Sequence, residues 1–195
     1  MTDILRLAAQ NQQTAYDIIA RSKIIDCWQA VGAEINLIGS LKTGLLMKHR
    51  DIDFHIYTPT LDIARSFKAV SALAQNPHIK KVTYDNLLNL PDTCLEWHAW
   101  YETDDGSLWQ IDMIHMPKGS PFDGYFEKIA ERISAIMSPA QKETILRLKY
   151  QTPDNQKIPG IMYYMAVLRD NITEYAAFEN WLQQNKTDGI INWIP

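Results

Sequence analysis

Residues 51–57 alternate strictly between apolar and polar side chains. The apolar positions are Ile52, Phe54 and Ile56. The polar positions begin with Asp51 and Asp53. Because successive side chains of a strand point to opposite faces, this pattern predicts a β-strand with one dry face. The chain must therefore build a sheet whose apolar side is covered and whose other side presents two carboxylates.

Asp51 and Asp53 would project from the same face, roughly 6–7 Å apart at Cα. Two carboxylates this close repel each other and lose hydration, so they usually need a cation between them. Oxygen ligands suit Mg²⁺, which keeps several waters and completes its shell with substrate phosphates. Upstream, Gly39 allows a backbone to approach a phosphate, and Ser40 offers a hydroxyl and an N–H group. The segment thus predicts a magnesium and phosphate site.

A third acid, Asp112, interrupts residues 109–114, which otherwise are typical of a buried strand. An ionised carboxylate there is costly unless something compensates it. If this strand lies beside the strand at 51–57, three carboxylates converge and can hold two metal ions about 3.5–4 Å apart. One ion would orient a triphosphate, and the other would activate an acceptor hydroxyl whose proton passes to Asp112.

The order Gly39-Ser40, spacer, Asp51-x-Asp53 and a later Asp112 resembles the active-site signature of the DNA-polymerase-β-like nucleotidyltransferase superfamily. The resemblance covers about residues 14–115 and implies a mixed sheet flanked by helices, two Mg²⁺ ions and a nucleoside triphosphate donor. It also implies that Ser40 contacts the terminal phosphates, that both acids of the pair bridge the metals, and that Asp112 holds the catalytic metal.

Residues 49–54 are particularly similar to small antibiotic nucleotidyltransferases that modify lincosamides or aminoglycosides. Many of those enzymes carry Gly-Gly where this chain has Gly39 and Ser40. That departure preserves the chemistry but weakens the assignment to antibiotics. Some small relatives build the acceptor site between two subunits, so the resemblance also allows a homodimer.

Other candidate residues have simpler interpretations beside the functional one. Lys42 and Arg50 could contact phosphates, or they could be a surface lysine and a charge that balances the acid pair. On the strand predicted over 95–101, Glu96 alternates onto one face with His98 and Trp100. If that face meets the metals, Glu96 could replace Asp112 as the general base and Trp100 could stack on a base or acceptor. An ordinary amphipathic strand is the simpler interpretation.

The coarse pattern predicts an α+β fold: a helix, a sheet with one embedded helix, and a helical C-terminal portion. We expect a nucleotidyltransferase core at residues 1–120 and a helical segment at 121–195, packed together as one unit. The expected helices are 14–31, 61–74, 122–137, 140–150, 160–171 and 174–185. The expected strands are 34–38, 51–57, 79–84, 94–103 and 108–115.

The net charge and the lengths of the apolar segments limit the partners and the cellular location that we expect. The net charge is −4, without the basic imprint of a protein that grips nucleic acid broadly, so nucleic acid is not an expected partner. No apolar segment approaches the ~20 residues needed to span a bilayer, and the first residues lack a signal-peptide pattern. These features predict a cytoplasmic protein.

The sequence therefore predicts Mg²⁺-dependent transfer of a nucleoside monophosphate, AMP in the simplest case, from ATP or another NTP to a hydroxyl or phosphate of a small molecule. Two alternatives remain open. One is a non-catalytic nucleotide-binding or antitoxin-like interaction module on the same fold. The other is a metal-dependent phosphohydrolase, in which water replaces the acceptor.

Overall fold

The computed structural model describes residues 3–91, 93–185, 191 and 193–195. Within them, five strands form one mixed sheet in the order β1-β2-β5-β4-β3. The strands are β1 (Glu34–Leu37), β2 (Asp51–Thr58), β3 (Ile79–Asn86), β4 (Leu95–Glu102) and β5 (Leu108–Pro117). The central neighbours β2 and β5 are parallel, whereas the other pairs are antiparallel. The predicted α+β class is confirmed.

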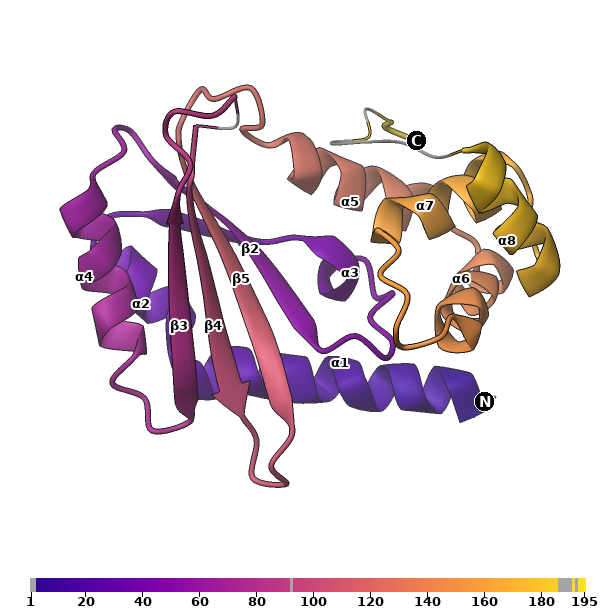
Figure 1. The fold of residues 1–195 in the computed structure, drawn as a ribbon, viewed down its shortest axis with the longest axis horizontal. Helices are drawn as coiled ribbons and strands as arrows, with labels where there is room; N and C mark the ends of the chain where they lie inside the picture. The colour runs from indigo at the N-terminus through magenta and orange to yellow at the C-terminus, as the bar shows by residue number, and fades with distance from the viewer. Residues whose placement is uncertain (1–2, 92, 186–190, 192) are drawn as a thin grey trace.

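The described helices divide into two groups (Figure 1). The first group is α1 (Asp3–Ser22), α2 (Ile24–Gln29), the short α3 (Gly39–Lys42) and α4 (Ile63–Leu73). The second is α5 (Tyr125–Ile136), α6 (Pro139–Gln151), α7 (Gly160–Tyr164), a π-helical turn (Met165–Arg169) and α8 (Tyr175–Gln184). Figure 1 shows α2 and α4 together at one side of the sheet, α1 running along its end, and α5 to α8 gathered on the opposite side.

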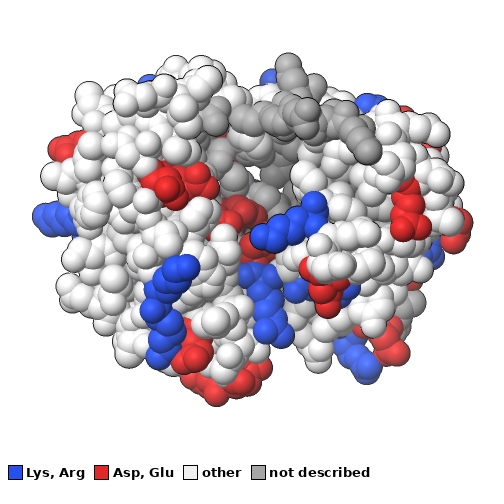
Figure 2. Space-filling view, in the orientation of Figure 1, with Lys and Arg blue, Asp and Glu red and all other residues white. Residues whose placement is uncertain are grey.

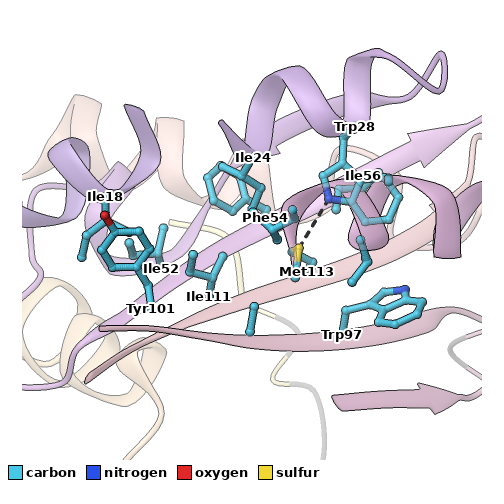
Figure 3. Packing of buried hydrophobic residues seen from close by; sticks show 14 of the residues in the cluster. Ile18, Ile24, Trp28, Ile52, Phe54, Ile56, Trp97, Tyr101, Ile111 and Met113 are labelled. Atoms are coloured by element: carbon cyan, nitrogen blue, oxygen red, sulfur yellow. Dashed lines mark hydrogen bonds between the residues drawn. The ribbon is translucent and has the colours of Figure 1, made fainter. Parts of the chain in front are cut away.

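The apolar face of the sheet forms the first hydrophobic core (Figure 3). Ile24 and Trp28 of α2 are fully buried against this face, and Trp28 Nε1 donates a hydrogen bond to Met113 Sδ at 3.4 Å. Phe54 of β2 lies between them in the view. Burial of each such side chain contributes about 1.5–3 kcal/mol, so this face fixes which side of β2 turns inward. Asp51 and Asp53 are thereby directed to the other side.

A second hydrophobic core lies among the C-terminal helices. Tyr163 stacks on Phe178 with ring centroids 4.7 Å apart. Ala8 of α1 and Leu45 and Met47 of the α3–β2 connection are buried in the same cluster. Helix α1 thus packs against both parts of the chain, its second half on the sheet and its first half on the C-terminal helices.

Two predicted helices differ from the structure. The helix expected at 14–31 begins at Asp3 and is interrupted at Lys23, whose φ of 60° is left-handed and cannot continue a helix. The helix expected at 160–171 ends as a π-helical turn from Met165, a change that apolar spacing does not encode. No helix in the described ranges is both long and apolar enough to cross a membrane.

Candidate active site

Strand pairing places the three acids together. Asp53 of β2 is the direct partner of Asp112 on β5, and Asp51 is the partner of Gln110. Paired residues of neighbouring strands project from the same face of a sheet, so all three carboxylates lie on the face opposite the first core. Strands β2 and β5 are therefore neighbours in the sheet, as the convergence of Asp51, Asp53 and Asp112 requires.

Gly39 lies directly against the acid pair. Its φ is +68°, and a Cβ built on it would fall 2.1 Å from Asp53 Oδ2. The Ile38 N–H group donates to the Asp53 carbonyl at 2.9 Å, which fixes the end of β1 to β2. Only glycine combines this backbone conformation with such close contact. The Gly39-Ser40 turn is therefore held next to the Asp53 carboxylate.

The electrostatics of the acid pair favour a bound cation. Burial raises the pKa of Asp53 to about 8, and the negative charges of Asp51 and Asp112 add to the effect. Asp51 Oδ1 is buried and has no hydrogen-bond partner among the described residues. A buried polar atom without a partner is costly, and a cation would relieve both that cost and the repulsion. The donor set, carboxylate oxygen only, suits Mg²⁺.

Asp112 is held by two neighbours on the same face. Its Oδ1 lies 2.5 Å from His98 Nδ1 and accepts a hydrogen bond from Gln110 Nε2 at 2.7 Å. His98 Nε2 in turn lies 2.9 Å from Glu96 Oε1. In the described part of the chain no three His, Cys, Asp or Glu side chains are already arranged as a formed metal centre. The contacts of Asp112 with His98 and Gln110 both use Oδ1, which leaves Oδ2 for a cation.

The side chains of Glu96, His98 and Trp100 on β4 lie on the same side of the sheet as the three acids. His98 is the direct strand partner of Asp112, and Trp100 is the partner of Gln110, so both point to the acid side of the sheet. Glu96 contacts His98 but is one side chain removed from Asp112. His98 therefore links Glu96 to Asp112 and orients both. Its position as the strand partner of Asp112 could not be read from the alternation alone.

A cleft of about 400 Å³ opens beside Gly39, Ser40, Asp51 and Asp53. Its opposite wall is apolar and comes from α5 and α7, with Phe126, Ile133 and Tyr164 among the lining residues. Asp51 and Asp53 are the only charged residues that line it within the described chain. A cleft with an apolar wall and a few polar groups at one end suits a flat organic group attached to an anion that a cation holds.

Two predicted phosphate contacts lie elsewhere. Lys42 is exposed at the end of α3 and lines a different cavity, with Glu34 and Glu127, rather than the cleft of the acid pair. Arg50 is exposed and lines a second cleft that also contains Asp51 and Asp112. The structure therefore brings Gly39, Ser40 and the acids together, keeps Arg50 near them, and places Lys42 apart.

Lys149 of α6 is a site residue that the sequence did not reveal. Its Nζ donates to the Leu45 carbonyl at 3.0 Å and lies 3.4 Å from the Tyr164 hydroxyl. It lines a small cavity with Ser40 and Asp51, and its positive charge lowers the pKa of Asp53. One signal was available: Lys149 follows Ile145 by four positions and so falls on the buried face of α6.

No family model matches the chain, and no curated protein matches it. Solved structures do. The Cid1 poly(U) polymerase bound to MgGTP is similar with a TM-score of 0.57 and 14% identity, over 80% of this chain and 54% of that one. A cytoplasmic RNA terminal U-transferase gives a TM-score of 0.53 and 13% identity, over 86% and 51%. The non-canonical poly(A) polymerase GLD-2, in complex with GLD-3, gives 0.53 and 9%, over 86% and 58%.

The chain has the nucleotidyltransferase fold. At these identities the likeness is one of fold, and the chain spans about half the length of the proteins it matches. The fold that the Gly39-Ser40 and Asp51-x-Asp53 pattern implied is thereby confirmed. The first of these proteins has also been solved with Mg and 3′-dATP, and a mutant of it with MgATP.

Proposed function

We propose that this protein transfers a nucleoside monophosphate, AMP in the simplest case, from an NTP to an acceptor, using two Mg²⁺ ions. The observation that carries the proposal is the crowding of Asp51, Asp53 and Asp112 on one sheet face beside the Gly39-Ser40 turn. In the transfer, the acceptor oxygen bonds to the α-phosphorus while the bond to the bridging oxygen breaks and pyrophosphate leaves.

The side chains divide this work. Asp51, Asp53 and Asp112 would hold the magnesium, which supplies charge neutralisation for the triphosphate and activation of the attacking hydroxyl. Ser40 and Lys149 border the same small cavity and would bind donor phosphates. Asp112 accepts the acceptor proton. His98 and Gln110 are positioning residues that hold the Asp112 carboxylate. Glu96 remains the alternative general base, acting through its contact with His98.

The donor base fits the apolar cleft. Ser40 and the acid pair lie at one end of this 400 Å³ space, and α5 and α7 form its apolar wall. Tyr164 lies in that wall and offers an aromatic ring on which a base can stack. Two kinds of acceptor are consistent with this proposal. One is the small molecule expected from the sequence. The other is RNA, because the similar proteins include a poly(U) polymerase and an RNA terminal U-transferase.

Calorimetric titration with a non-hydrolysable ATP analogue tests the proposal. We expect binding in Mg²⁺ and none in EDTA, because the acids repel the triphosphate when no cation lies between them. The double variant Asp51→Ala/Asp53→Ala should lose Mg²⁺-dependent binding while remaining folded. Absence of binding of any NTP by the folded wild-type protein would contradict the transferase. Hydrolysis of NTP to monophosphate without acceptor dependence would favour the phosphohydrolase, and binding without turnover the non-catalytic module.

Lys149→Gln is expected to weaken binding of the Mg²⁺–ATP analogue about 10-fold, since a charge-assisted phosphate contact is lost. Lys142→Gln is the matched control. Lys142 lies on the same helix, but it lines neither of the two clefts next to the acids nor the small cavity of Lys149. Titration of both variants under one set of conditions checks the prediction. Equal weakening by the two substitutions would show that only the total charge of α6 matters.

A further inference from the structure

A second cleft, of about 500 Å³, lies on the Asp112 side of the acid pair. Asp51 lines both this cleft and the apolar one, so it stands between them. Gln110 and Asp112 of β5 form one part of the second cleft. If the donor base lies in the apolar cleft, the acceptor reaches the α-phosphorus from the side of Asp112. The second cleft is therefore the acceptor side of the proposed transfer.

The charges of the two clefts differ. The apolar cleft has no basic lining residue in the described chain, whereas the second cleft has three: His49, Arg50 and Lys157. His49 and Arg50 precede β2, and Lys157 comes from the connection between α6 and α7. In Figure 2, basic side chains stand next to the acidic ones in the hollow at the middle of the molecule.

Arg50 and Lys157 are not committed to other partners. Neither side chain makes an ion pair or hydrogen bond with another described residue, and both are exposed. The neighbouring Lys48, in contrast, is paired with Asp154 at 2.7 Å and also donates to the Thr152 carbonyl. The two cations at the second cleft are thus available to a ligand.

These cations are also not the counter-charge of Asp53. The positive charge that lowers the pKa of Asp53 is that of Lys149. Arg50 acts instead, as a minor cause, on Asp105, and His49 acts in the same way on Asp154.

We infer that the acceptor is a molecule with a hydroxyl and a phosphate group, the phosphate being bound by Arg50 and Lys157. This inference rests on the proposed function. Arg binds phosphate through a planar fork and Lys through a point charge. Asp51 and Asp112 repel an anion, so the phosphate lies toward the basic residues while the hydroxyl points to Asp112. That hydroxyl loses its proton to Asp112 as it bonds to the α-phosphorus and displaces pyrophosphate.

Matched pairs of probes test the inference. The pairs are ribose and ribose 5-phosphate, adenosine and adenosine 5′-monophosphate, and uridine and a uridylyl dinucleotide. Each is titrated into the protein with Mg²⁺, with and without the bound ATP analogue. In at least one pair the phosphate-bearing member should bind about 10-fold more tightly than its partner. Lys157→Gln and Arg50→Gln should remove that difference, and Lys157→Arg should retain it. Lys128→Gln, an exposed lysine of α5, is the control and should change nothing.

The outcomes separate the two proposals. If the ATP analogue itself does not bind, the proposed function fails, and that titration involves no acceptor. If the analogue binds but every pair binds alike, the inference is overturned while the transferase stands. It is also overturned if Lys157→Gln weakens binding of the analogue as much as that of the phosphate probe, since the cations then serve the donor. Preference for ribose 5-phosphate would identify a phosphosugar, and preference for the dinucleotide an RNA end. Both support the phosphate.

Discussion

Asp53→Asn is expected to raise the melting temperature of the metal-free protein near neutral pH, by roughly 2–4 °C for each kcal/mol of stability gained, while it impairs nucleotidyl transfer. In the folded protein, burial and the charges of Asp51 and Asp112 raise the pKa of Asp53 to about 8. In the unfolded chain an aspartate titrates near 3.9. The wild-type protein must therefore fold against the cost of keeping this group protonated or of burying its charge.

The sign follows from proton binding. Between about pH 4 and pH 8 the folded metal-free protein retains the Asp53 proton and the unfolded chain releases it. Stability of the wild type therefore falls as pH rises through this window, by up to about 1.4 kcal/mol per pH unit. Asparagine does not titrate, so the stability of the variant does not fall in this way as pH rises. Its advantage should be present near neutral pH and disappear below about pH 4.

Thermal melts in EDTA across this pH range measure the effect. Asp85→Asn is the control, because Asp85 is exposed on β3 and should give melting curves like those of wild type. A second set of melts with Mg²⁺ and the ATP analogue should reverse the order, since the ligand then stabilises only the wild type. Transfer by the variant should fall on the order of 100-fold or more. A melting temperature that gains nothing near neutral pH would show that Asp53 is not destabilising without metal.

The part of the site that lies on strands was predictable from the sequence. Alternation with a period of two reports burial directly, and it placed Asp51 and Asp53 on the polar face of β2. The position of β5 beside β2 was reached by chemistry instead, because Asp112 in an apolar segment needs compensation nearby. Pairing of Asp53 with Asp112 agrees with that argument.

The part of the site that depends on helix packing was not predictable. Lys149 reaches Ser40 and Asp51 only because α6 packs against α1 and the α3–β2 connection, contacts between distant segments that leave no periodic signal. Lys42 shows the converse. It follows Ser40 by two positions, but two steps along a helix rotate a side chain by about 200°, so it points away from the acids. For Lys42, proximity to Ser40 in the sequence therefore gave the wrong position in space. The residues that line the two clefts could not be predicted from the sequence either.

Gly39→Ala is expected to destabilise the protein by about 2 kcal/mol or more and to lower transfer by about 100-fold. Two costs add. The backbone has a φ of +68°, where a side chain is strained, and the new Cβ would lie 2.1 Å from Asp53 Oδ2. The carboxylate or the Gly39-Ser40 turn must move, and either movement displaces a group that the donor triphosphate requires.

Gly106→Ala separates these costs. Gly106 has a similar φ of +78° in the β4–β5 hairpin, but a Cβ there would meet no atom within 4 Å. It should lose only the backbone contribution, about 1 kcal/mol, and keep transfer at the wild-type level. Denaturant unfolding and pyrophosphate release measure both variants. In an Asp53→Ala background, where the remaining Cβ is 3.1 Å from the new methyl group, the cost of Gly39→Ala should fall toward that of Gly106→Ala. Equal costs for the two glycines in the wild-type background would mean that the turn yields freely, and that its contact with Asp53 does not position the acid pair.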